Sequence, residues 1–288
     1  MIAVFRHELE SYFTSLTGFV FGAFLLLFAG IYTMVYNISS ALTNFEYVLG
    51  GMSFVFLVIV PVLTMRVLAE ERKQKTDRLL YSLPLSMTEV VLGKYTAMLV
   101  IYLLPMLVIS VYPLILSAYG NVHFPAAYSA VIGFFFLGAA LIAIGTFVSS
   151  VTESQAVAAG LCFVVMMINY FIADLASFVS TTAASSYFAF GVLIAVAAWV
   201  FYRMTRNGLA AGLLLFAGEA ALILCYVVSS ESFEGLFPEL MTQLSLFERF
   251  YVFLDGVFDV TGIVYFVTVA AVFLFMSVQS MEKRRWSE

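Results

Sequence analysis

The sequence contains little charge. Asp, Glu, Lys and Arg make up 11% of its 288 residues and hydrophobic residues make up 63%, against roughly 25% and roughly 45–50% in soluble domains. A soluble fold of this length cannot bury so much apolar surface, so we expect a multi-pass membrane protein. The net charge of -5 carries little information, because charges in such a chain are sorted by membrane side. Nucleic-acid binding through a basic patch is therefore disfavoured.

Cysteine and histidine are also scarce. Cys162 and Cys225 both lie in apolar runs, where neither a disulfide framework nor a metal site is expected. The two histidines, His7 and His123, are predicted on opposite sides of the membrane. No HExxH, Ser-His-Asp or paired intramembrane aspartate pattern is present. We therefore expect this chain to have no enzymatic activity, no metal and no cofactor of its own.

A phosphate-binding loop is absent too. Such a loop needs Gly-x4-Gly-Lys-Ser/Thr, so that backbone amides cradle the phosphates and a hydroxyl holds magnesium. The candidate pair Gly93-Lys94 has Thr88 in place of the first glycine, and Tyr95 follows it instead of Ser or Thr. If ATP and magnesium are used, another chain must hold them.

Apolar runs of membrane length dominate what is present. They predict an all-α fold with one transmembrane domain over residues 1–288. Every Lys and Arg except Arg249 falls on one side of the resulting map. The positive-inside rule places that side, with both termini, in the cytoplasm, and the chain in the cell (cytoplasmic) membrane. The expected spans are about 17–37, 51–69, 95–118, 127–149, 156–175, 187–203, 208–228 and 260–281.

Two segments outside these spans have helical apolar spacing. Residues 1–16 fit a helix that lies along the inner membrane surface, although a plain polar flank would also fit. The extracellular stretch 229–259 contains an amphipathic helix over Phe237–Phe258. That helix would serve as a lid, as a platform for a partner, or only as interfacial packing.

The segment 70–94 concentrates cytoplasmic charge. A helix start is predicted at Thr76–Arg78, a short apolar face follows, and Pro84 ends the helix. Ser86 with Glu89 forms a capping box that opens a second helix. Two short helices at a sharp corner would make a docking knob, whereas the alternative is a solvated basic loop.

The run MRVLAEERKQKTDRLLYSLPLSMTEVVLGKY, residues 65–95, resembles the cytoplasmic coupling segment of ABC-2 type permeases. The likeness is strongest to the branch related to the gliding-motility permease GldF. Shared features are an acidic pair, a basic cluster, Thr, a Leu pair, Ser-x-Pro-x-Ser and a hydrophobic-Leu-Gly-Lys close. The sequence departs from this pattern at 75–78, where it reads Lys-Thr-Asp-Arg and Gly-Thr-hydrophobic-Glu is commoner. The resemblance extends to residues 138–159 and 249–266.

This resemblance implies that the chain is the membrane-spanning permease subunit of an ATP-binding cassette transporter that works as an exporter. The implied partners are a dimer of separate ATPase subunits that hold ATP and magnesium, and a second permease copy or a paralogue. Relatives of this branch also resemble systems with an additional membrane subunit that bears a large extracellular domain. The residues implied in ATPase coupling are Glu70, Glu71, Arg72, Thr76, Asp77, Arg78, Leu79, Leu80, Leu83, Pro84 and Ser86.

Glu219 is a carboxylate near the middle of a predicted span. A charge at that depth costs about 2.5 kcal/mol or more, so it should face protein or water. It would be a group of the substrate path or a structural carboxyl, with Asn169 and Asp174 as candidate polar partners. A secondary transporter or channel would carry several such groups and internal repeats. That class and a purely structural membrane anchor are the alternatives to the permease.

The predicted topology can be tested by labelling. In a background without Cys162 and Cys225, a cysteine at Ser82 should react with an impermeant thiol reagent only from the cytoplasmic side. A cysteine at Glu234 should react only from outside. Labelling of both positions from the same face would contradict the map.

Overall fold

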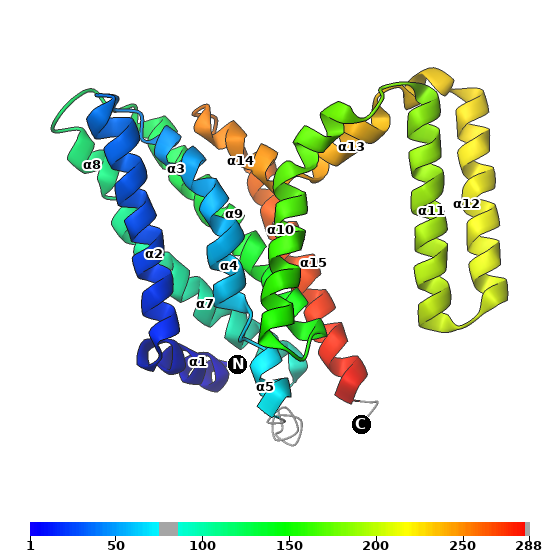
Figure 1. The fold of residues 1–288 in the computed structure, drawn as a ribbon, viewed down its shortest axis with the longest axis horizontal. Coiled ribbons are helices and arrows are strands. Elements are labelled where there is room, and N and C mark those ends of the chain that lie inside the picture. The colour runs from blue at the N-terminus through cyan, green and yellow to red at the C-terminus, as the bar shows by residue number, and fades with distance from the viewer. Residues whose placement is uncertain (75–85, 286–288) are drawn as a thin grey trace. The chain divides into compact units, whose positions relative to one another are not determined.

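A computed structural model describes residues 1–74 and 86–285 of the chain (Figure 1). Every regular element within these ranges is helical, which confirms the predicted all-α class. Eight helical stretches in the described part of the chain are long and apolar enough to cross a membrane, which confirms the predicted number. They are Leu16–Ser39, Glu46–Lys73, Met87–Leu116, Phe124–Val151, Gln155–Phe178, Ala183–Arg203, Gly208–Val228 and Val260–Arg285.

The individual elements divide some of these stretches, because several helices are interrupted. In chain order they are α1 (Ile2–Thr14), α2 (Leu16–Thr33), a π-helix (Met34–Ser39), α3 (Glu46–Met52), a 3-10 turn (Ser53–Val55), α4 (Phe56–Thr64), α5 (Ala69–Gln74), α7 (Met87–Ile109), α8 (Tyr112–Leu116), α9 (Phe124–Val151), α10 (Gln155–Phe178), α11 (Ala183–Thr205), α12 (Gly208–Val228), a 3-10 turn (Ser230–Phe233), α13 (Leu236–Leu244), α14 (Leu246–Leu254) and α15 (Val260–Arg285).

The chain forms two compact units, residues 1–168 with 249–288, and residues 169–248. In the first unit, α9 is the central helix, and 78% of its most apolar 18-residue window is buried. Small residues on α9 let neighbouring helices approach closely. A Cβ placed on Gly138 would lie 2.5 Å from the Tyr102 hydroxyl, which donates a 2.7 Å hydrogen bond to the Phe134 carbonyl. Glycine at this position therefore allows the α7 tyrosine to pack against α9.

The second span is broken between α4 and α5. Its backbone N–H groups at the break would lack partners inside a membrane, so a neighbouring side chain must accept from them. The buried Ser149 hydroxyl of α9 does so, accepting from the amides of Leu68 and Ala69 at 3.1 Å each. The start of α5 is thereby fixed to the end of α9.

The predicted capping box is confirmed, but the helix that it opens is not short. The Ser86 hydroxyl accepts from the Glu89 amide, and the Glu89 carboxylate accepts from the Ser86 amide, at 3.2 Å each. The helix then continues to Ile109. The predicted boundary near 95 was wrong because no helix-breaking residue follows the cap until Pro105, which α7 also contains. The first predicted helix of the knob lies outside the described residues.

The second unit contains the α11–α12 hairpin (Figure 1). Arg206 takes a left-handed conformation with φ of 52°, and Asn207 caps α12 by accepting from the Ala210 amide at 3.2 Å. The amphipathic helix predicted over residues 237–258 is in fact two helices. Its break lies at Ser245, whose hydroxyl accepts from the Glu248 amide and so begins α14.

The close contact of α4 with α9 generates a stability prediction. A Cβ on Gly145 would overlap the buried, β-branched Thr64 side chain, whereas a Cβ on Gly160 of α10 would meet no atom within 4 Å. Gly145→Ala should therefore destabilise the protein by about 1–3 kcal/mol, and Gly160→Ala should not. The measurement is the apparent unfolding temperature in detergent by fluorescence size-exclusion. Equal unfolding temperatures for the two variants would contradict this packing.

Candidate functional site

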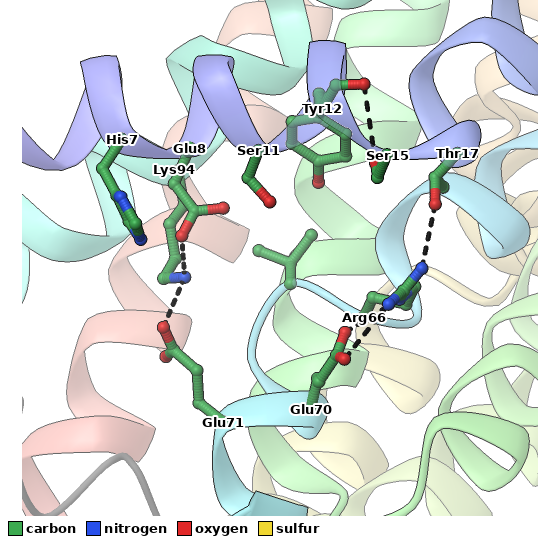
Figure 2. A pocket seen from close by; sticks show the side chains of 11 residues that line it. His7, Glu8, Ser11, Tyr12, Ser15, Thr17, Arg66, Glu70, Glu71 and Lys94 are labelled. Carbon is green, nitrogen blue, oxygen red and sulfur yellow. Dashed lines mark hydrogen bonds and ion pairs between the residues drawn. The ribbon is translucent and has the colours of Figure 1, made fainter.

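A polar cavity lies at one end of the first unit, where α1 meets the start of α2, the α4–α5 junction and α7 (Figure 2). Its volume is about 390 Å³. In a chain with so few charged residues, this concentration of ionic side chains marks the cavity as the candidate functional site. It is lined by His7, Glu8, Ser11, Tyr12, Ser15, Thr17, Arg66, Val67, Glu70, Glu71 and Lys94.

Lys94 is the central group of this site. Its side chain is 3% exposed, and its ammonium nitrogen lies 2.5 Å from Glu8 Oε1 and 2.8 Å from Glu71 Oε1. A buried cation is tolerated only when opposite charges and hydrogen bonds offset its desolvation. Two carboxylates do so here, one from α1 and one from α5. A single ammonium group on α7 therefore joins three helices.

Gly93 explains how α1 can come near enough. A Cβ on this glycine would lie 3.1 Å from Val4 Cγ1 and 3.2 Å from the Met1 carbonyl oxygen. Without a side chain at this point, α1 packs directly against α7. Glu8 follows Val4 by about one helical turn and so reaches the adjacent Lys94. Gly93 therefore allows α1 to approach α7 closely, and Lys94 pairs with the nearby carboxylates.

Tyr12 lies one further turn along the same face of α1. Its side chain is buried, and burial raises the pKa of its hydroxyl above the ordinary value. The hydroxyl therefore stays protonated at neutral pH. Tyr12 therefore contributes a polar but uncharged part of the cavity wall, between the ion pairs of Lys94 and that of Arg66.

Arg66 forms the second ion-pair group. Its guanidinium donates to both Glu70 carboxylate oxygens, at 2.8 and 3.1 Å, and to the Thr17 hydroxyl at 3.0 Å. Arg66 is 41% exposed, so this pair should contribute modestly to stability. Its main consequence is geometric, because it links the α4–α5 junction to the first turn of α2.

The opposite side of α5 is attached to the end of α9. The buried Arg72 side chain donates to the Thr152 carbonyl at 3.2 Å. On α15, Arg284 donates to the Val151 carbonyl at 3.0 Å. Together with the Ser149 cap, these bonds hold α5, α9 and α15 as one group at this end of the unit.

The predicted coupling residues are partly brought together. Glu70, Glu71 and Arg72 lie on α5 and contact the helices around it, and Ser86 caps α7. Thr76, Asp77, Arg78, Leu79, Leu80, Leu83 and Pro84 lie outside the described residues.

Sequence reasoning missed part of the site. Lys94 was assigned to the charged segment 70–94 and Glu8 to the expected surface helix 1–16, whereas the two form an ion pair with the lysine buried. The available signal was a lysine that directly precedes a long apolar run. Such a cation needs acidic partners, but the sequence does not say where in the chain they lie.

The two predicted intramembrane polar residues, Asn169 and Glu219, are not brought together. Asn169 instead stabilises the junction between α13 and α14 in the second unit. Its side-chain amide donates to the Leu244 carbonyl at 3.1 Å, and its oxygen accepts from the Leu246 amide at 3.0 Å. Glu219 lies on α12 against Gly191 of α11.

The family described as "ABC-2 family transporter protein" matches residues 2–284, nearly the whole chain. A search of curated proteins found no match.

The buried ion pairs of Lys94 generate a further prediction. Lys94→Met should destabilise the protein by about 3–5 kcal/mol, because it removes the buried cation that Glu8 and Glu71 share. Lys73→Met, which removes an exposed lysine on α5, is the matched control and should have little effect. The measurement is the apparent unfolding temperature in detergent.

A rescue variant distinguishes charge from packing. Adding Glu8→Gln and Glu71→Gln to Lys94→Met removes the uncompensated charges and should recover much of the lost stability. An unchanged unfolding temperature for Lys94→Met alone would show that the pairing does not hold the helices together.

Proposed function

The chain belongs to the ABC-2 family of transporter proteins, and we propose that it is the permease subunit of an exporter driven by a separate ATPase. Family permeases generally act with ATPase subunits. The proposed complex contains two ATPase subunits, which hold ATP and magnesium, and two permease subunits. The second permease is a copy of this chain or a paralogue. An additional membrane subunit with a large extracellular domain would meet the 229–259 stretch.

The observation that supports this proposal is the Lys94 cluster, formed by Lys94 with Glu8 and Glu71. Residues 70–94 are the proposed ATPase-docking segment, and the cluster lies where both of its ends join the membrane helices. Glu71 is on the helix that enters the segment, and Lys94 is on the helix that leaves it. Because both are bound to each other, displacement of the segment moves α5 and α7 together.

The same contacts give that displacement a route into the spans. Glu8 adds α1 to the moving group, and α1 is followed directly by α2. Arg66 links the α4–α5 junction to Thr17 at the start of α2. ATP-driven closure of the ATPase pair would therefore tilt α2 and α7 as rigid bodies, the kind of motion that opens and closes a substrate path.

A charge-neutral variant tests this mechanism. The triple variant Glu8→Gln, Glu71→Gln, Lys94→Met removes the ionic link without leaving a buried charge. It should still bind the ATPase but lose stimulation of ATP hydrolysis by roughly tenfold, the size expected for a coupling free energy of about 1.4 kcal/mol. The complex would be purified from native membranes, with the ATPase identified by mass spectrometry. Its hydrolysis rate would then be compared with that of the isolated ATPase.

Two comparison variants complete the experiment. Arg6→Gln with Glu10→Gln removes an exposed ion pair on α1, whose side chains are 80% and 63% exposed, and should leave stimulation unchanged. Leu80→Asp puts a charge on the predicted apolar face of the docking segment and should abolish ATPase binding itself. Full stimulation in the triple variant would refute the coupling role, and absence of any co-purifying ATPase would refute the proposed function.

A further inference from the structure

Glu219 occupies the middle of α12, far from both helix ends. Its carboxylate lies over Gly191 of α11, where a Cβ would come within 3.4 Å of both carboxylate oxygens. That distance is an ordinary van der Waals contact, so the carboxylate lies directly against α11 at the seam of the hairpin. The side chain is only partly covered.

This carboxylate has no hydrogen bond or ion pair to any residue that the structure describes. The sequence excludes a basic partner at the same depth from the rest of the chain. Lysines and arginines in the eight candidate spans lie toward the span ends. The two that lie farthest from an end, Lys94 and Arg66, are already paired with other carboxylates.

The surface around Glu219 is apolar and open. An open groove of about 410 Å³ is lined by Glu219 together with Phe216, Ala220, Ile223 and Leu224, all on α12. Only 6% of the most apolar 18-residue window of α12 is buried. In a membrane this surface meets lipid or another helix. Lipid chains offer nothing to a carboxylate, which costs about 2.5–3.5 kcal/mol at mid-membrane depth when unpaired.

We propose that this face of α12 docks a transmembrane helix of another subunit that carries a lysine or arginine at mid-membrane depth. Charge complementarity selects this occupant. A second copy of this chain would bring another carboxylate to the interface, and like charges repel in a medium of low polarity. The inference depends on α12 crossing the membrane and not on ATP-driven transport.

Association with a defined peptide tests the proposal. The probe is a synthetic transmembrane peptide of about 20 leucines with one central lysine, labelled with an acceptor fluorophore. The donor is placed on the full-length protein at Cys225, which is exposed and lies on α12, whereas Cys162 is buried. Energy transfer in proteoliposomes should show roughly tenfold tighter association for the lysine peptide than for an all-leucine peptide.

Matched variants decide the origin of that preference. Glu219→Gln should remove it, whereas Glu231→Gln, in the 3-10 turn after the hairpin, should retain it. Equal association of the lysine and all-leucine peptides, or a preference that survives in Glu219→Gln, would overturn the proposal. So would energy transfer between donor- and acceptor-labelled copies of the protein that Glu219→Gln abolishes, because the carboxylate would then serve self-association.

Discussion

The burial of one ammonium group between two carboxylates is the interaction on which the arrangement of α1, α5 and α7 depends. Removing a cation from water costs several kcal/mol, and the cost is offset only while both opposite charges stay within hydrogen-bonding distance. Lys94 therefore cannot remain buried if either α1 or α5 moves away from it. This requirement makes the three helices a mechanical unit at the place where residues 70–94 join the membrane helices, and Gly93 allows α1 and α7 to come close enough for it.

The same physical rule governs the interruptions in the helices. A break in a helix leaves backbone groups without partners inside the helix, and where water cannot reach these groups a polar side chain from elsewhere must bond to them. Ser149 accepts from two amides at the α4–α5 junction, and Asn169 bonds on both sides of the α13–α14 junction. These few polar residues thus hold the helices on either side of each junction. Because the second span is broken and its break is held by Ser149, α5 leads into the proposed docking segment.

Lys94 and Glu219 both place a charged side chain in apolar surroundings, and the energetic cost of doing so is offset in two different ways. Lys94 finds its counter-charges within the chain, where it serves to hold helices together. The Glu219 carboxylate lies beside apolar residues on a helix of which only 6% of the most apolar window is buried. A family permease works as part of an assembly, so an acidic group that the chain itself does not neutralise is naturally explained by a partner helix. The ion pairs of Lys94 would then transmit motion, and the Glu219 carboxylate would specify an assembly contact.

The sequence by itself determined the all-α class, the eight membrane-length helices and the Ser86–Glu89 cap. These features depend on local properties: the bilayer fixes the length of an apolar run, and a capping box spans four consecutive residues. It also identified Glu71 as a coupling candidate, whereas the branch within the family and the membrane orientation stay predictions. Only the structure decided that the helix opened by Ser86 continues to Ile109, that Asn169 serves a helix junction, and that Glu8 and Glu71 share Lys94. Glu8 and Lys94 are 86 positions apart. A charged residue in a hydrophobic run indicates that it needs a polar or oppositely charged partner, but which residue becomes that partner depends on how the helices pack.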